Sequence, residues 1–301
     1  MASKFQLPKT WSPDELEVDR TKAIQVFVAR RLKEGAPDYL RHYRESEALT
    51  ESLLALTGNL LKLEPEEFLE KTNLVKDVAR FVAGPPVSAD DFKTLLGFKG
   101  IRRGDAAGIR DALDRIAELV DSSRFPWVSE NRQPKPQERR SAVVATASLR
   151  AVERARTGRR SAEKERQEPF VAQTMRQMGL AEIGKVNDPD KDLPEGSFRR
   201  DVKFEGKQCD ILVRLFDGRF LAIECKSSNS AVNSVKRLND VFEKAQVWAR
   251  ERGTRVDSAA VIAGVVKRNK LEETQDKNIY LFWEHNLGPL KEFILATKKT
   301  S

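Results

Sequence analysis

The chain has 301 residues, enough for one large domain or two smaller ones, each with its own core. Lys and Arg outnumber Asp and Glu by 54 to 46, and the net charge of +8 favours a polyanionic partner such as nucleic acid or an anionic membrane. The two cysteines and two histidines argue against a disulfide scaffold and against a zinc cluster.

The chain lacks the apolar segments expected of membrane or secreted proteins. No run approaches the roughly 18 apolar residues of a membrane-spanning helix, and the start "MASKFQLPKTW" has no signal-peptide core. No amphipathic helix combines bulky apolar residues with a Lys-rich face, which argues against a protein that lies on anionic membranes. We therefore expect a cytoplasmic, reduced protein.

The chain from Ser12 to about residue 125 has a helical pattern without strand-like alternation. Ser12-Pro13-Asp14-Glu15 predicts an N-cap, a Pro at the first helical position and a Glu that completes a capping box. Breaks are expected at "AGPPVS" and "RFPWVSENRQPKPQ". Residues 1–130 should therefore form an N-terminal helical region, with further helices at about 37–62, 65–82, 88–97 and 105–121.

A long basic helix is expected next, at about 136–158, and "TGRRS" should separate it from an amphipathic helix at about 161–178. Between Arg132 and Arg166, eleven Lys or Arg residues stand against four Glu residues, a local charge of +7. This segment is either an ordinary solvated helix face or a surface for a polyanion.

The pattern changes after "NDPDKDLPEGS", a loop by composition. "QCDILVRLF" and "RFLAIECK" predict two strands joined at Asp217-Gly218, a hairpin signal. A helix at 229–252, strands at 258–266 and 278–283, and a helix at 285–296 follow. The order predicts an α/β (α+β) fold with a mixed central sheet flanked by helices, and residues 131–301 as one core that includes the basic helix.

Three charged residues interrupt these apolar strands: Asp210, Glu224 and Lys226. Buried charges are costly unless they are paired or bind a metal. The two carboxylates, with the Cys225 carbonyl, offer the hard oxygen ligands that Mg²⁺ needs for phosphodiester hydrolysis. Lys226 leaves the strand on the side of Glu224, where it could orient or help deprotonate a water molecule.

The spacing acid-x-Lys is not specific, because it also occurs at Asp91, Asp201 and Glu205. The alternative is a structural Glu–Lys pair at a strand end, and the register of the hairpin decides between the two. A three-residue loop of residues 217–219 would pair Phe216 with Phe220 and put Asp210 on the face of Glu224, whereas a two-residue turn would put it on the reverse. We expect the longer loop, with Gly218 left-handed, or a bulge that corrects the register.

The segment after Lys226 suits contact with nucleic acid. The serines between Ser227 and Ser230 can cap the following helix, whose start attracts phosphates. Asn and Arg side chains can read base edges. The expected contacts are Ser227, Asn229, Asn233, Lys236 and Arg237. The alternative is ordinary capping followed by a solvated helix face.

Asp210 and Glu224-Cys-Lys226 together resemble the signature of the PD-(D/E)XK nuclease superfamily, although Cys209 stands where the motif has Pro. Within it, "IECKSSNSAVNSVKRLND", "RFPWV", "AGPPVS" and "LFWEHNL" are similar to the XamI-type family of type II restriction endonucleases. The resemblance implies that both acids bind Mg²⁺ and that Lys226 assists catalysis. It also implies an acid on a helix before the hairpin, for which Glu168 and Glu165 are candidates, Glu168 lying at a turn if Pro169 begins a helix.

The leading hypothesis is a sequence-specific, Mg²⁺-dependent endonuclease. The resemblance implies a homodimer that cuts both strands of a short palindromic DNA duplex, partnered in its system by a protective methyltransferase. The alternatives are a structure-selective repair or junction nuclease of the same superfamily and a DNA-binding regulator without catalysis. Phosphate contacts, which position a protein without reading sequence, are expected from Arg139, Arg140, Arg150 and Arg154.

Overall fold

A computed structural model describes residues 6–97 and 100–298. The chain divides into two compact units, one of Met1–Lys33 with Arg160–Ser301 and the other of Glu34–Arg159. The division falls inside two long helices, α1 (Pro13–Leu56) and α5 (Pro136–Gln177). It differs from the boundary expected at residue 130. The division into domains at 1–130 and 131–301 stays a prediction about independent folding, which limited proteolysis would test.

The first unit is built around a mixed sheet, which has six strands among the described residues, in the order β1-β2-β3-β4-β5-β6. β2, β3 and β4 pair antiparallel, whereas β1 with β2, β4 with β5 and β5 with β6 pair parallel. The predicted fold class and the predicted order from β3 onward are confirmed. The strands are β1 (Ala181–Glu182), β2 (Ser197–Phe204), β3 (Lys207–Arg214), β4 (Phe220–Ser228), β5 (Val256–Gly264) and β6 (Ile279–Trp283).

Strands β1 and β2 were not predicted from the sequence. β2 reads "SFRRDVKF", and its charged residues hide the apolar alternation that marks a strand. Pairing with β3 along most of its length holds it in the sheet. An ion pair of 2.7 Å between Arg200 on β2 and Glu182 on β1 adds to the pairing of these two strands. Tertiary contacts therefore override the local pattern here.

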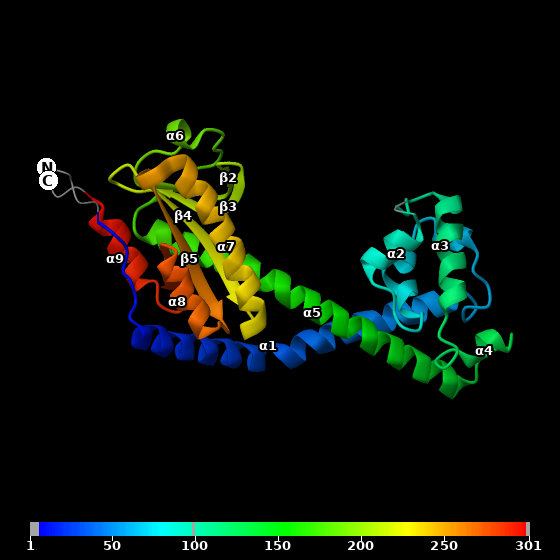
Figure 1. The fold of residues 1–301 in the computed structure, drawn as a ribbon. Helices are drawn as coiled ribbons and strands as arrows, with labels where there is room; N and C mark the ends of the chain where they lie inside the picture. The colour runs from blue at the N-terminus through cyan, green and yellow to red at the C-terminus, as the bar shows by residue number, and fades with distance from the viewer. Residues whose placement is uncertain (1–5, 98–99, 299–301) are drawn as a thin grey trace, which may run out of the picture. The chain divides into compact units, whose positions relative to one another are not determined.

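Helices cover both faces of the sheet. On one face, α7 (Ala231–Arg252) lies along β4 and β5, and α8 (Arg268–Asp276) and the first turns of α1 complete the layer (Figure 1). On the other face, the last turns of α5 and helix α9 (Gly288–Ala296) cover the strands. The two faces follow the alternation of each strand: Leu212 and Ala222 face α7, whereas Ile211 and Ile223 face α5.

The two long helices are more continuous than the sequence suggested. The predicted capping box is confirmed, because Ser12 N–H donates to Glu15 at 2.8 Å and Glu15 N–H donates to Ser12 Oγ at 3.3 Å. The predicted start of a new helix near residue 37 is wrong, because α1 runs through Pro37. Similarly, α5 runs through Gly158, where "TGRRS" was expected to interrupt it. A Pro or Gly inside a helix lowers the stability of that helix without necessarily ending it. No described helix is both long and apolar enough to cross a membrane.

The second unit is helical in its described residues. The α1 and α5 segments within it, together with shorter helices, enclose a core that contains Leu53, Phe68, Leu113, Phe125 and Trp127. The single helix expected at 65–82 is instead a set of 3₁₀ and π turns. The shorter elements are Pro65–Phe68, Leu74–Val78, Ala79–Phe81, α2 (Ala89–Leu95), α3 (Ala106–Leu119) and α4 (Pro126–Ser129); the first unit adds α6 (Pro189–Asp192) and a 3₁₀ turn at Gly253–Arg255.

Candidate active site

The hairpin between β3 and β4 sets the register of the charged residues. Leu215 N–H donates to Arg219 O at 2.8 Å, which closes a three-residue loop ending at Gly218 with φ 85°. The predicted loop length and the left-handed Gly218 are therefore confirmed. The predicted pairing of Phe216 with Phe220 is wrong, because Phe220 pairs with Arg214. In three-residue hairpin loops, the left-handed residue occupies the last position. With Gly218 in that position, the loop comprises residues 216–218 instead of the predicted 217–219.

This register brings the three charged residues together on the face covered by α7. The backbone pairing of β3 with β4 ends at the pair Ile211 and Ile223. Asp210 on β3 and Glu224 on β4 are the next residues beyond that pair, one on each strand. Beyond this pair, the Cys225 N–H donates to Asp210 Oδ2 at 2.8 Å. The Asp210 carboxylate thus takes the place of the β3 backbone carbonyl that would otherwise accept the next hydrogen bond. Lys226 Nζ lies 2.6 Å from Glu224 Oε2 and 3.9 Å from Asp210 Oδ2. The expected convergence of Asp210, Glu224 and Lys226 is observed.

The Glu224 carboxyl group is fully buried, with 0 % of its side chain exposed. Burial raises its pKa, and the charge of Lys226 opposes this effect only in part. Burial alone would lower the pKa of Lys226, but the carboxylates of Glu224 and Asp210 outweigh it and raise that pKa above its usual value. The Oε1 atom of Glu224 has no hydrogen-bond partner among the described residues. Such an unsatisfied buried oxygen needs an explanation.

Helix α7 adds two charged residues that sequence reasoning missed. Lys244 Nζ lies 2.7 Å from Glu224 Oε2, and Asp240 Oδ2 lies 3.1 Å from Lys226 Nζ. Their i,i+4 spacing beside the apolar residues of α7 was a usable signal, because it places both on the margin of the buried face. The helix after a candidate strand should therefore be searched for charges that reach back to it.

The donor atoms at this site fit a divalent cation. Among residues 6–97 and 100–298, no group of three or more His, Cys, Asp or Glu side chains is arranged to hold a metal ion. Two carboxylates from adjacent strands nevertheless converge, and the buried Oε1 of Glu224 is free of hydrogen bonds to the described residues. Mg²⁺ in proteins is typically bound by one or two carboxylates, with water and substrate oxygens as its other ligands. The two carboxylates of Asp210 and Glu224 are thus enough protein ligands for a Mg²⁺ ion.

Comparison with known proteins agrees with this geometry. The family described as XamI restriction endonuclease matches residues 58–283, about three quarters of the chain. The type II restriction enzyme XamI of Xanthomonas campestris pv. amaranthicola is 32% identical over 261 residues, which cover 82% of this chain and 93% of the relative. The chain belongs to the XamI restriction endonuclease family. The family and the enzyme class predicted from the sequence, a DNA endonuclease, are confirmed.

In this XamI family member, Glu168 lies close to the strand that carries the site. The neighbouring Gln167 donates to Val261 O on β5 at 3.1 Å, and Val261 pairs with Cys225. Burial raises the pKa of the Cys225 thiol, and the nearby carboxylates of Asp210 and Glu168 raise it further. Glu165 is exposed. Pro169 lies inside α5 and does not begin a helix, so the expected turn at Glu168 is wrong.

The start of α7 is exposed beside the charged site of this XamI family member. Ser230 is the N-cap, with its Oγ accepting from Asn233 N–H at 3.2 Å. Ser227 is buried, which leaves little of it for contact with DNA. The other four expected contacts are exposed: Asn229, Asn233, Lys236 and Arg237.

A second exposed basic segment, missed in the sequence, lies beside this helix start. Lys267 N–H donates to Ser234 Oγ at 3.1 Å, and Val265 N–H donates to Ser228 O at 2.7 Å. These bonds hold the loop between β5 and α8 against the start of α7. The loop continues into Arg268 and Asn269, and residues 267–269 are all exposed. "KRNK" after an apolar strand was the signal that could have identified it.

The basic segment of α5 is largely paired with acids of its own unit. Arg139 forms a 2.5 Å ion pair with Glu51, and Arg154 pairs with Asp77. Arg150 is only 2 % exposed, and it donates to Ser46 Oγ at 2.9 Å. Its burial contradicts the expected phosphate contact.

Arg140 keeps most of its surface free: its side chain is 62 % exposed, although it also pairs with Glu47 at 2.6 Å. The local charge of +7 therefore overstates the free positive charge of this helix. The acids that reduce it are far away in the sequence, on α1 and near residue 77.

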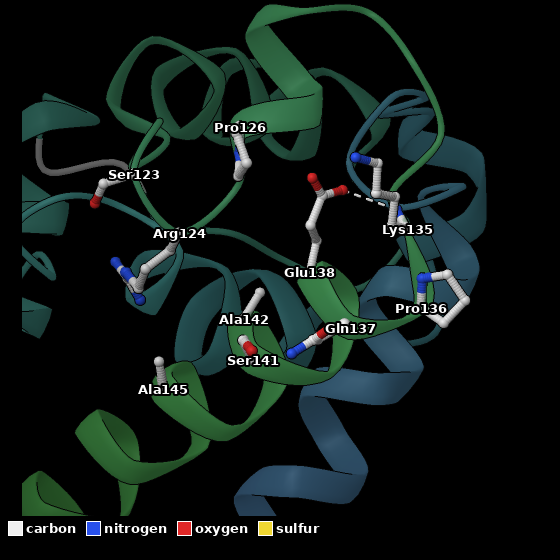
Figure 2. A pocket seen from close by; sticks show the side chains of 10 residues that line it. All are labelled: Ser123, Arg124, Pro126, Lys135, Pro136, Gln137, Glu138, Ser141, Ala142 and Ala145. Carbon is white, nitrogen blue, oxygen red and sulfur yellow. Dashed lines mark hydrogen bonds between the residues drawn. The ribbon is translucent and has the colours of Figure 1, made fainter.

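The second unit also contains an open cavity of about 850 Å³ beside α4 and the start of α5 (Figure 2). Glu138 points into this region, but its carboxylate accepts from Lys135 N–H at 2.8 Å and pairs with Arg132 at 2.8 Å. Arg124, also in the lining, donates to Phe81 O at 2.8 Å. The carboxylate of Glu138 and the guanidinium of Arg124 therefore make contacts within the unit.

Proposed function

We propose that this restriction endonuclease hydrolyses both strands of duplex DNA at a short palindromic sequence, using Mg²⁺ held by Asp210, Glu224 and the Cys225 carbonyl. The observation that carries the proposal is the fully buried Glu224 carboxylate, which lies beside Asp210 and Lys226 and has one oxygen without a hydrogen bond to any residue that the structure describes. A structural ion pair would not need that oxygen, whereas a cation would.

Each residue of the site has a distinct role in this proposal. Bound Mg²⁺ supplies charge stabilisation for the phosphate and lowers the pKa of a bound water molecule. Asp210 and Glu224 fix the position of the ion, and the bond from Cys225 N–H orients the Asp210 carboxylate. Lys226 lies within reach of both acids, where its ammonium group orients the attacking water and offsets charge on the scissile phosphate. Glu168 serves as an additional acid beside Cys225.

Two exposed segments at one edge of the sheet are proposed to contact DNA. The start of α7 offers Asn229, Asn233, Lys236 and Arg237, and the adjoining start of α8 offers its N-cap Lys267 with Arg268 and Asn269. Amide and guanidinium groups can form paired hydrogen bonds with base edges, whereas lysines, and arginines such as Arg268, also contact phosphates. Both segments follow the carboxyl ends of β4 and β5, the strands that lead to the site. In the second unit, Arg140 is the most exposed of the four expected phosphate contacts, and Arg139 and Arg154 would have to exchange an acidic partner for a phosphate.

Changing Arg268 to Gln should weaken DNA binding similarly for all sequences and reduce the salt dependence of log K by about 1, because one phosphate contact is lost. Arg268 is exposed, and its 3.2 Å ion pair with Glu272 is an i,i+4 pair on the surface of α8, so its loss should change stability little. Fluorescence anisotropy in Ca²⁺ at several salt concentrations measures the slope. Arg250→Gln, in the last turn of α7, is the matched control. Equal slopes for Arg268→Gln and wild type would remove the loop from the proposed DNA surface.

The proposed substrate also bears on the oligomeric state, the cellular compartment and the partner enzyme. Two copies related by twofold symmetry would present one site to each strand, so we propose a homodimer. A DNA substrate and two free cysteines suit the cytoplasm. A protective methyltransferase of the same system would shield the host genome, without direct complex formation.

Incubation of intact plasmid or phage DNA with the protein and Mg²⁺ should yield discrete fragments, and EDTA should abolish cleavage because the carboxylates alone cannot activate water. Sequencing of the fragment ends reads out the recognition site and cut position. Cleavage restricted to branched or nicked DNA would instead indicate a repair or junction nuclease. Tight DNA binding without any Mg²⁺-dependent cleavage would indicate a regulator and would refute the proposal.

A further inference from the structure

Lys244 is held in the candidate active site by contacts that a surface lysine does not make. Its Nζ lies 2.7 Å from Glu224 Oε2, the oxygen that also accepts from Lys226 at 2.6 Å. The side chain is only 16 % exposed, and its second neighbour, Asp240, lies 4.0 Å away on the same helix. Two ammonium groups thus share one oxygen of a buried carboxylate, while the other oxygen has no partner among the described residues.

The charges of this cluster do not cancel. Three carboxylates, those of Asp210, Glu224 and Asp240, surround the two ammonium groups of Lys226 and Lys244. The cluster carries a net charge of −1 when all five groups are ionised, and without Lys244 it would carry −2. A buried Glu224 with Lys226 as its single cation would be poorly compensated before a metal arrives.

We propose that Lys244 is a positioning residue that serves as the counter-ion of Glu224 in the metal-free enzyme and opposes the binding of the divalent cation. This inference rests on the proposed metal site. By occupying Oε2, Lys244 keeps the Glu224 carboxylate in place with Oε1 available. It also shares the charge of Glu224, so that Lys226 is not the only cation holding this carboxylate. The consequence is a site that is stable when empty and binds its cation weakly.

This role predicts opposite effects of one substitution on stability and on metal affinity. Lys244→Met should lower the stability of the metal-free protein and bind Ca²⁺ about tenfold more tightly, because a positive charge near the cation is removed. Lys244→Arg should keep the affinity of wild type. A lysine that only packs α7 against the sheet would weaken both properties together. Isothermal titration with Ca²⁺, in the absence of DNA, measures the affinity, and thermal unfolding in EDTA measures the stability.

Three further variants make the result decisive. Lys277→Met removes a more exposed lysine–glutamate pair of 2.6 Å at the end of α8 and should leave Ca²⁺ affinity unchanged. Asp240→Asn, at a side chain that is 52 % exposed, should bind Ca²⁺ several-fold more weakly even if Lys244→Met fails to fold. Glu224→Gln should abolish Ca²⁺ binding.

The outcomes separate the inference from the proposed function. Unchanged or weaker Ca²⁺ binding by folded Lys244→Met, together with loss of binding in Glu224→Gln, would overturn the role of Lys244 and leave the metal site standing. Unchanged Ca²⁺ affinity in Asp240→Asn would also count against the idea that the charges of Asp240, Lys244 and Lys226 jointly set the affinity of the site for its cation. Undiminished Ca²⁺ binding by Glu224→Gln would instead refute the metal site itself, and the inference with it.

Discussion

Replacing Asp210 by Asn should reduce Mg²⁺-dependent DNA cleavage by roughly 10²–10³-fold or more while the protein remains folded and binds DNA. The amide oxygen of Asn can still accept the 2.8 Å hydrogen bond from Cys225 N–H, so the junction of β3 and β4 is preserved. What is lost is the negative charge that the cation requires. Single-turnover cleavage measures the chemical step apart from product release.

The matched control for this substitution is Asp276→Asn, at an exposed position at the end of α8. Its cleavage rate should equal that of wild type. DNA affinity is measured in Ca²⁺ to prevent cutting. Wild type and Asp276→Asn should bind DNA equally, and Asp210→Asn should bind it equally or slightly more tightly, because a negative charge near the phosphate is removed. Full activity of Asp210→Asn would show that the residue is structural and that the metal lies elsewhere.

The hairpin was predictable because local chemistry determines it. Gly218 can adopt the left-handed conformation without strain, and successive side chains of a strand point to opposite faces, so the register of the hairpin determines which residues share a face. From these two features the convergence of Asp210, Glu224 and Lys226 followed. The partner of Phe220 lies two residues from the predicted one, and a shift by an even number of residues leaves each side chain on the same face of the sheet.

The remaining features depend on contacts between distant segments, which a single sequence does not reveal. Lys244 lies 20 residues from Glu224, and although its spacing from Asp240 places it at the margin of the buried face of α7, the sequence does not show that Glu224 is its partner. The basic helix looked like a free polyanion surface because Glu51 and Asp77, which pair with its arginines, are far away along the chain. β2 was missed for the same reason: its stability comes from its neighbour in the sheet and not from its own pattern.

Glu224→Ala should lower the free energy of unfolding of the metal-free protein by about 3 kcal/mol, because breaking a buried ion pair leaves uncompensated charge. Two ammonium groups, those of Lys226 and Lys244, lose their shared partner. The loss should fall at the lower end of the range for buried pairs, because half-exposed Asp240 can take over part of the charge. Urea denaturation in EDTA, followed by circular dichroism, measures the change.

A double-mutant cycle shows whether this loss comes from the charge cluster. Adding Lys244→Ala to Glu224→Ala should cost much less than Lys244→Ala alone, with a coupling of roughly 1–3 kcal/mol, because the lysine no longer has a buried partner to lose. Glu243→Ala, exposed on the same helix, should change stability by no more than about 0.5 kcal/mol. Additive effects of the two substitutions would mean that Lys244 and Glu224 contribute independently through packing. A large coupling would mean that the charges of Lys244 and Glu224 stabilise the metal-free site as a pair.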